Sequence, residues 1–531
     1  MNKISLMDCT LRDGGFINEW RFGHGDMINL FERSVSAGID YIEAGFLDSR
    51  ESFDINRSIT PDTAGFDRIF GGLDHGSSKI FAMIDYGTCP QENIAEAKDT
   101  IIDGIRVMVK KKTRYEALEF CAELKKKGYM VFVQPVSVTG YSDEEMLELV
   151  ERVNELEPFA MSIVDTYGLL DSVSLLHYFD LIDSKMKPSV ALGYHAHNNF
   201  QLAYSNSMAF CERKTDRELL VDGSAYGMGK SAGNCPLELL TMYANAHFSK
   251  SYDTSQILEM IDTGIMKIYE RSPWGYQLQY FLCASNDCHP KYAQYLIKKK
   301  TLSMRSIDEI LKQIKSGEKL AFNEEYIERL YLDYQNNEIN DASDMEELKA
   351  SLKGKEVLVL GPAKSIEEKR SEITDYIARK APIVIAINFM PGGYALRYLF
   401  LSNSKRYMQL STKLCTAHPD MQIIATSNVT SASGKFDYVA DYATLIDSSF
   451  EIPDNSLPML LRLLERLEPS KVSLAGFDGY VAKKNENYAA SDMEYEFVKD
   501  YAVKLNEYTR RVIASLREKL DISFVTESRY E

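Results

Sequence analysis

The sequence predicts an α/β protein made of a (β/α)8 TIM barrel, a helical segment and a C-terminal Rossmann-like α/β domain. Within roughly the first 245 residues, eight short apolar runs alternate with longer amphipathic runs, as the strands and helices of a TIM barrel do. Polar residues recur just after these apolar runs. The chain has 531 residues, which is enough for about two to four domains. A doubly wound sheet remains the alternative, because a count of strands does not show that a sheet closes.

We assign the barrel to residues 1–249. Ser142 precedes an acidic run, and both features favour the start of a helix at residue 143. The predicted helices include 116–127, 143–156 and 171–184. The predicted strands are short apolar runs at residues 4–8, 39–44, 79–84, 104–109, 129–134, 160–164, 190–195 and 218–222.

Residues 250–345 predict a helical extension, and the charged residues 337–354 predict a linker. The Rossmann-like domain is assigned to residues 346–531. Its first strand begins at Glu356 and leads through Gly361 to a helix start, where an anion could bind. The other strand candidates are 383–387, 422–425, 443–446 and 471–474, and the long helices are 364–379 and 491–518.

Composition excludes several classes of function. The 61 Lys and Arg residues against 78 Asp and Glu residues give a net charge of −17, which argues against nonspecific binding to nucleic acid or to anionic membranes. The 8 cysteines form no CxxC pair, so no zinc ribbon or dithiol motif is predicted. No signal peptide and no apolar run of about 18 residues is found. We therefore expect a cytoplasmic protein.

The first strand ends in a cluster of polar residues that includes Asp8, Arg12 and Asp13. Gly14 and Gly15 follow, and two glycines let the backbone turn sharply. A strand that ends in a carboxylate, a guanidinium and a flexible turn is suited to an anionic substrate and a cation. A salt-bridged turn without chemistry is the alternative.

Two histidines stand two residues apart near the seventh predicted strand. His195 and His197 would point to the same side of an extended strand. Two imidazoles together with a carboxylate such as Asp13 suit a borderline divalent metal such as Zn, Mn, Co or Fe. Two surface histidines in a loop are the alternative reading.

Further polar residues end other predicted strands. Glu43 ends the second strand, and Asp165 and Thr166 end the sixth. In a closed barrel the carboxyl ends of all strands meet at one face, where the chemistry lies. We expect Glu43, Asp165 and Thr166 to orient a substrate or to brace Arg12.

Three motifs occur in order along the first part of the chain. They are Asp8-Cys9-Thr10-Leu11-Arg12-Asp13-Gly14, His195-Ala196-His197-Asn198 and Gly227-Met228-Gly229-Lys230-Ser231-Ala232-Gly233-Asn234. Together they resemble the metal-dependent aldolase/lyase TIM-barrel superfamily (HMG-CoA lyase-like, with the pyruvate carboxyltransferase domain). The likeness covers about residues 1–245 and is closest to the 4-hydroxy-2-oxovalerate aldolases.

The resemblance implies a divalent metal ion (Mn, Mg, Co or Zn), with Asn234 as a possible fourth ligand beside Asp13, His195 and His197. It implies that Arg12 stabilises an enolate after cleavage of a 2-oxo acid. The helical segment after the barrel donates a tyrosine in such aldolases, and the candidates here are Tyr276 and Tyr280.

The sequence departs from the aldolase pattern at one position. The aldolases carry a general-base histidine three residues after the metal aspartate, where this chain has Phe16. His24 is nearby in sequence and is our candidate for a replacement base.

We therefore predict a metal-dependent lyase that makes or breaks a C–C bond of a 2-oxo acid with an aldehyde partner. The alternatives are a Claisen-type enzyme that condenses acyl-CoA, and a non-catalytic barrel whose C-terminal domain binds a ligand. A homo-oligomer is compatible with the sequence, and neither nucleic acid nor a membrane is expected as a partner.

Overall fold

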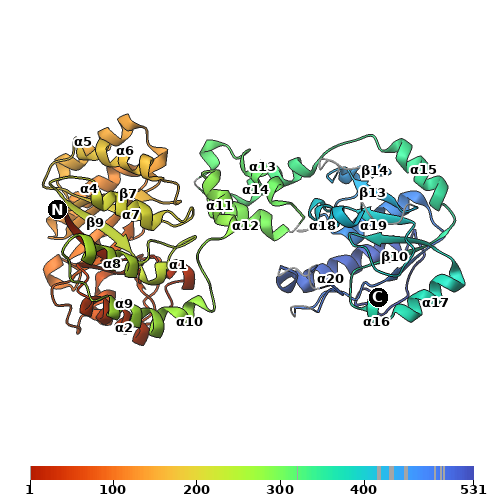
Figure 1. Ribbon diagram of the computed structural model, residues 1–531, viewed down its shortest axis with the longest axis horizontal. Helices are drawn as coiled ribbons and strands as arrows, with labels where there is room; N and C mark the ends of the chain where they lie inside the picture. Colours follow the sequence, from red (N-terminus) through yellow and green to blue (C-terminus); the bar gives the residue numbers. More distant parts are fainter. Residues whose placement is uncertain are drawn as a thin grey trace. The chain divides into compact units, whose positions relative to one another are not determined.

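A computed structural model describes residues 2–299, 301–319, 321–414, 420–429, 436–447, 453–482, 486–490, 493 and 497–531. The chain forms two compact units, Met1–Pro290 and Lys291–Glu531 (Figure 1). The division falls inside the predicted helical extension 250–345, whose helices are therefore shared between the units. Our division at residues 249 and 345 stays a prediction.

The first unit is the predicted (β/α)8 barrel. Its strands are parallel, and β1 pairs with both β2 and β9, which closes the ring and excludes a doubly wound sheet here. A short strand that we did not predict, β3 (Ile59–Thr60), pairs with β2. The barrel strands are β1 (Lys3–Asp8), β2 (Tyr41–Leu47), β4 (Lys79–Asp85), β5 (Gly104–Val109), β6 (Met130–Pro135), β7 (Ala160–Asp165), β8 (Ala191–Ala196) and β9 (Glu218–Gly223).

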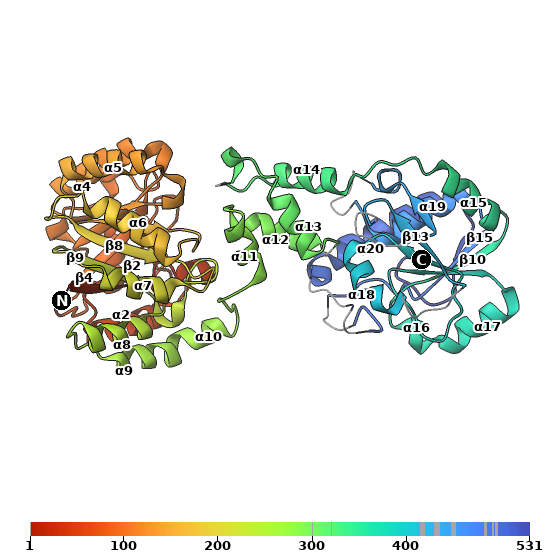
Figure 2. The same cartoon turned by 45° about the horizontal axis from the view of Figure 1, so that its top comes forward.

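Amphipathic helices surround these strands. In Figure 2, α4, α5 and α6 lie along one side of the barrel, and α2, α8 and α9 lie along the opposite side. Ser142 caps α5 in a capping box with Glu145, as the acidic run predicted. The helices of this unit are α1 (Gly15–Asn18), α2 (His24–Ser36), α3 (Thr63–Phe70), α4 (Arg114–Lys126), α5 (Asp143–Leu156), α6 (Ser172–Asp183), α7 (Ala203–Glu212), α8 (Leu237–His247), α9 (Thr254–Met260), α10 (Met266–Tyr269) and α11 (Leu278–Ser285).

Alternation along the strands separates two cores. In β1, Ile4 and Leu6 belong to the core shared with the helices, whereas Met7 belongs to the barrel interior with Phe81 and Phe132. These interior side chains fill the barrel as a packed core.

The prediction that Glu43 ends its strand is wrong. β2 continues to Leu47, and its register with β4 shifts between Glu43 and Gly45. A Cβ at Gly45 would lie 1.8 Å from the carbonyl oxygen of Ser58, so only glycine allows this close approach. Alternation from Tyr41, which belongs to the barrel interior, places the Glu43 carboxylate inside the barrel with no exposed surface.

The second unit contains the predicted Rossmann-like sheet, with seven parallel strands in the order β14-β13-β12-β11-β10-β15-β16. Along β10, Val357 and Val359 pack on one face, and Leu358 and Leu360 pack on the other. The strands are β10 (Glu356–Leu360), β11 (Ile383–Ile387), β12 (Tyr398–Leu401), β13 (Gln422–Thr426), β14 (Tyr438–Ala440), β15 (Lys471–Ala475) and β16 (Ile522–Phe524).

Helices cover both faces of this sheet. Buried residues of α15, α19 and α20 share one core, and those of α16, α17 and α18 share the other. Three further helices precede them. The helices are α12 (Pro290–Lys299), α13 (Met304–Leu311), α14 (Glu324–Gln335), α15 (Ala342–Leu352), α16 (Ser365–Glu368), α17 (Arg370–Lys380), α18 (Ser404–Leu414), α19 (Ser456–Leu467) and α20 (Phe497–Leu516).

Two predictions for this part of the chain are wrong. Residues 443–446 are not a strand, because β14 lies earlier and Tyr442–Thr444 form a 3-10 turn. The predicted linker contains α15, whose Met345, Leu348 and Leu352 form a buried apolar stripe. The start of the predicted helix 491–518 lies outside the described residues. No helix in the described part of the chain is long and apolar enough to span a bilayer.

Candidate metal centre

Asp13, His195 and His197 come together at the carboxyl ends of the barrel strands. Their ligand atoms all lie within 4.8 Å of one another, and all three side chains are buried. The centres of the two imidazole rings lie 5.1 Å apart; His195 is near the end of β8, and His197 directly follows the strand. The spacing of two residues thus places both rings beside the carboxylate that follows β1.

The surrounding atoms fit a divalent cation. Asn234 donates a 2.7 Å hydrogen bond to the Asp13 carboxylate. Among the described residues, the buried atoms His197 Nδ1 and Asn234 Oδ1 have no hydrogen-bond partner. Orphaned buried ligand atoms next to a carboxylate are expected where a metal ion completes the site. One carboxylate, two imidazoles and an amide oxygen suit borderline metals.

The charges around Asp13 keep the cluster in a state that can bind metal. Burial alone would raise the pKa of Asp13, but the charge of Arg12 is the largest of the effects that oppose it, and that pKa is held well below its usual range. Burial lowers the pKa of His197 to about 3, so its imidazole is neutral near pH 7. A carboxylate binds a metal when it is ionised and an imidazole when it is neutral, and Asp13 and His197 meet these conditions.

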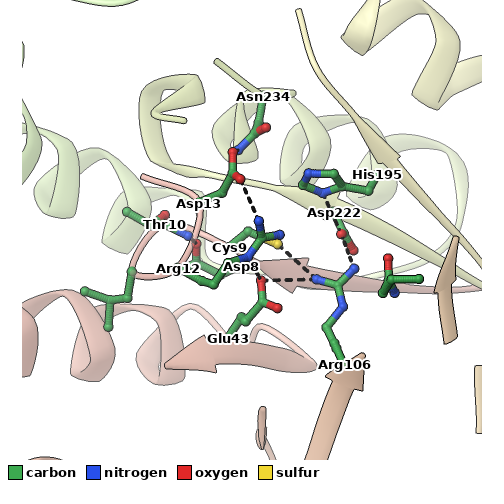
Figure 3. Close-up of polar contacts among 12 residues, drawn as sticks. Asp8, Cys9, Thr10, Arg12, Asp13, Glu43, Arg106, His195, Asp222 and Asn234 are labelled. Carbon is green, nitrogen blue, oxygen red and sulfur yellow. Dashed lines mark hydrogen bonds and ion pairs between the residues drawn. The ribbon is translucent and has the colours of Figure 1, made fainter. Parts of the chain in front are cut away.

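Arg12 lies beside this cluster, divided between two carboxylates (Figure 3). Its Nε donates to Glu43 at 2.7 Å and its Nη1 donates to Asp13 at 2.6 Å. Its Nη2 is buried and has no partner among the described residues. The guanidinium is therefore fixed in place with one donor nitrogen available to a bound anion.

Sequence reasoning missed Arg106 and Asp222. Arg106 in β5 has no exposed surface, and it pairs with Glu43 at 3.1 Å and with Asp222. Asp222 in turn accepts a 2.8 Å hydrogen bond from His195 Nδ1. This bond fixes the tautomer of His195 and leaves its Nε2 available for a metal. A charged residue inside an apolar strand such as Gly104–Val109 was the available signal.

A second close group of possible ligand atoms, Cys9, His195 and Asp222, holds a cation already. The Arg106 guanidinium donates to both Cys9 Sγ and Asp222. The side chain of Arg106 therefore occupies the side of Asp222 that a metal would need.

The other predicted site residues have local partners. The carboxylate of Asp165 accepts hydrogen bonds from the backbone amides of Leu169 and Leu170. The hydroxyl of Thr166 accepts one from the backbone amide of Ser137 at 2.7 Å. Both side chains thus organise loops at the mouth of the barrel.

The acid–base candidates lie on other elements. His24 is the first residue of α2, and Tyr280 is half-buried on α11. Tyr276 is 55% exposed, and among the described residues it makes no hydrogen bond to the cluster. Phe16 is 41% exposed, and the Lys230 ammonium lies 5.5 Å from the centre of its ring.

The first unit is thus a closed barrel that carries a carboxylate and two imidazoles at the carboxyl ends of its strands. These features place it in the class of barrel proteins with a candidate metal centre. Residues 3–263 match the family model described as HMGL-like, and this part of the chain is therefore an HMGL-like domain. The match ends before the second unit begins.

Individual relatives are similar to this chain over about half of its length. The 4-hydroxy-2-oxovalerate aldolase of Pseudoalteromonas translucida is 23% identical over 45% of this chain and 69% of its own length. The 2-isopropylmalate synthase of Sulfolobus acidocaldarius is 25% identical over 45% of this chain and 61% of its own length. A structure of hydroxymethylglutaryl-CoA lyase from Pseudomonas aeruginosa has a TM-score of 0.42 and 17% identity, covering 51% of this chain and 94% of that one. The relatives named here are enzymes.

Proposed function

We propose that the barrel is a divalent-metal-dependent lyase that makes or breaks a C–C bond of a 2-oxo acid through a pyruvate-type enolate. The observation that carries this proposal is the convergence of Asp13, His195 and His197 within 4.8 Å, next to a buried Arg12 nitrogen without a partner. The similarity to a 4-hydroxy-2-oxovalerate aldolase supports the same reaction class.

In this proposal Asp13, His195, His197 and Asn234 hold the metal ion. When bound, the ion polarises the keto group and carboxylate of the substrate. Arg12 directs Nη2 at the oxygen where enolate charge develops, and a fixed donor there stabilises the transition state without reorganisation. Glu43 and Asp13 hold the guanidinium in that orientation.

The proton of the aldol hydroxyl also needs an acceptor. His24, Tyr276 and Tyr280 remain our candidates. The position that holds a histidine in the aldolases is Phe16 here, and Lys230 is the charged residue beside its ring. We infer that Lys230 contacts the substrate carboxylate.

The test is exchange of pyruvate methyl protons with deuterated solvent, followed by NMR after chelation and reconstitution with Mn, Mg, Co or Zn. We expect metal-dependent exchange that His195→Ala abolishes. His177→Ala, a matched control at an exposed histidine paired with Asp143, should leave the exchange unchanged.

Two results would contradict the proposal. Bound metal without exchange in any small 2-oxo acid would favour a non-catalytic barrel. Release of free thiol from acetyl-CoA in the presence of a 2-oxo acid would favour the Claisen-type reaction, as expected from the similarity to 2-isopropylmalate synthases.

A further inference from the structure

The second unit contains a cavity at the carboxyl ends of β10, β11 and β15. Its empty space is about 980 Å³, counting the part open to solvent. Pro362 follows β10, Asn388 follows β11, and Gly476 follows β15, and all three line the cavity.

The order of the strands indicates that this cavity is a ligand-binding site. From β10 the chain runs outward through β11 and β12 to β14, and then returns to β15 on the opposite side of β10. The strand order therefore reverses between β10 and β15. In open parallel sheets, ligands bind at the carboxyl ends of the strands at such a reversal.

Two glycines allow two backbone segments to approach closely at this point. A Cβ at Gly361 would lie 2.4 Å from the carbonyl oxygen of Gly476, and a Cβ at Gly476 would lie 2.3 Å from that of Gly361. Gly476 also has a φ of +75°. Only glycine lets the two chain segments cross this closely beside the cavity.

The helix start after β10 is not the place for an anion. The Asp478 carboxylate accepts hydrogen bonds from both the backbone amide and the hydroxyl of Ser365. An internal carboxylate thus takes the place of the anion that the sequence predicted near Gly361. A bound anion would have to use other groups of the cavity wall.

Asp454 supplies an unused acceptor in that wall. Its Oδ2 accepts hydrogen bonds from the hydroxyls of Tyr331 and Tyr442. Its Oδ1 is buried and has no partner among the described residues, and the side chain is 4% exposed. A buried acceptor left unsatisfied is costly, so a ligand donor such as a hydroxyl is expected there.

The rest of the wall brings positive charge and aromatic rings. Arg406 is buried, and its Nη2 donates to the carbonyl oxygen of Met493 at 2.6 Å. Lys299 pairs with Glu328 at 2.7 Å and also lines the cavity. Tyr480 and Tyr488 lie with ring centres 6.4 Å apart on the same wall. Cations suit a phosphate, and aromatic faces suit a planar ring.

We propose that this cavity binds a nucleoside phosphate. The base stacks on the ring of Tyr480, a ribose hydroxyl donates to Asp454 Oδ1, and the phosphate lies toward Arg406 and Lys299. A planar ring, a hydroxyl donor and an anion are combined in this ligand class. The site is separate from the barrel chemistry and does not depend on it.

The test is calorimetric titration of the full-length protein with AMP, GMP, CMP and UMP, and with ribose 5-phosphate and inorganic phosphate for comparison. We expect one-to-one binding of at least one nucleotide. Asp454→Asn and Arg406→Gln should each weaken it by about tenfold or more, a change of about 1.4 kcal/mol. Asp420→Asn and Arg379→Gln are exposed controls in the same unit and should bind like the wild type.

Several outcomes would overturn the proposal. No nucleotide binding below a Kd of about 1 mM would do so, as would equal affinity for ribose 5-phosphate or inorganic phosphate. Tyr480→Leu changes no buried charge and should also weaken binding. If this variant and Asp454→Asn both bind normally, the assigned wall is wrong, even where Arg406→Gln fails to fold.

Discussion

Arg12 is the residue on which the proposed chemistry depends most directly. Two of its nitrogens are committed to Glu43 and Asp13, and only Nη2 is left for a substrate. Lysine carries the same charge, but its three donors sit on one compact nitrogen, which cannot span the two carboxylates and the substrate as the planar guanidinium does. Arg12→Lys should therefore lower the rate of pyruvate proton exchange by about 10²–10³.

Metal affinity separates this effect from loss of the site. We expect Arg12→Lys to bind metal as the wild type does, as measured by competition with a chromogenic chelator. Arg152→Lys, at an exposed arginine paired with Glu155, should leave both properties unchanged. Normal exchange in Arg12→Lys would remove Arg12 from the mechanism.

Asp222 acts on the metal through His195. Its carboxylate fixes the imidazole and also neutralises Arg106. Burial would raise the pKa of Asp222, but Arg106 and His195 bring it down to about 2, so it is ionised near pH 7. Asp222→Asn should weaken metal binding by about 10- to 100-fold. The exposed Asp216→Asn is the matched control, and unchanged affinity in Asp222→Asn would refute the positioning role.

Asp165 predicts a pH dependence of stability. Burial raises its pKa from 3.8 to about 7, so the folded protein holds this proton more tightly than the unfolded chain does. Stability from this group is therefore lost as pH rises from about 4 to about 7, by about 4 kcal/mol at most. In urea titrations, the stability of Asp165→Asn relative to wild type should rise across this interval. A difference that is constant with pH would contradict the assignment.

At the scale of single residues, the sequence revealed those site residues that belong to a local sequence pattern. His195 and His197 were recognisable from a spacing of two, and Asp13 from the end of a strand. Arg106 and Asp222 were missed because their partners lie 63 and 27 residues away along the chain. Such pairs become visible only when the barrel brings its strands together.

The loop after β9 is the element that completes the candidate centre. Asn234 in this loop donates a hydrogen bond to Asp13, and Gly229 packs against both side chains. A Cβ at Gly229 would lie 2.4 Å from Asn234 Nδ2 and 2.5 Å from Asp13 Oδ2. Gly229→Ala should therefore displace Asn234 and weaken metal binding about tenfold or more, because ligand geometry is lost.

The measurement is metal affinity together with the melting temperature. Gly140→Ala is the matched control, since a Cβ there meets nothing within 4 Å. Equal affinity in the two variants would show that Asn234 does not depend on this glycine.

Most elements were predictable because their signals are local. All eight barrel strands appear within a few residues of the apolar runs that predicted them. Helix α15 was missed because its buried stripe of Met345, Leu348 and Leu352 is interrupted by charged residues. The end of β2 at Leu47 could not be predicted from the sequence, since the irregularity at Gly45 depends on the neighbouring strand and on Ser58.

At the scale of the whole molecule, the two units have separate cores. The large core of the barrel contains residues of the first unit only, and the two cores around the second sheet contain residues of the second unit only. A ligand of one unit should thus stabilise that unit. Metal at about 100 times its Kd should add about 2.7 kcal/mol to the stability of the barrel.

Hydrogen exchange measured by mass spectrometry reports this separately for each unit. Slowed exchange should be confined to peptides within residues 3–263, and a chelator should reverse it. Peptides from β10 to β16 serve as the internal control. Protection that spreads over both units, or none at all, would contradict a metal site confined to the barrel.

Closure of the barrel was an expectation that only the pairing of β1 with β2 and β9 could establish. The boundary between the units was harder to foresee. Residues 250–345 form one compositional stretch, yet those after Pro290 belong to the second compact unit. Composition does not record which neighbour a helix packs against.

The interior of the barrel carries charges of alternating sign, from Asp13 through Arg12, Glu43 and Arg106 to Asp222. Each member is sheltered from water, so reversing the sign of one would strand its neighbours without an opposite charge. Single substitutions among these five charged residues should therefore be rare during evolution. Descendants of the protein would be expected to keep the five together or to exchange several in a single lineage, and new substrates would be gained mainly through the surrounding loops.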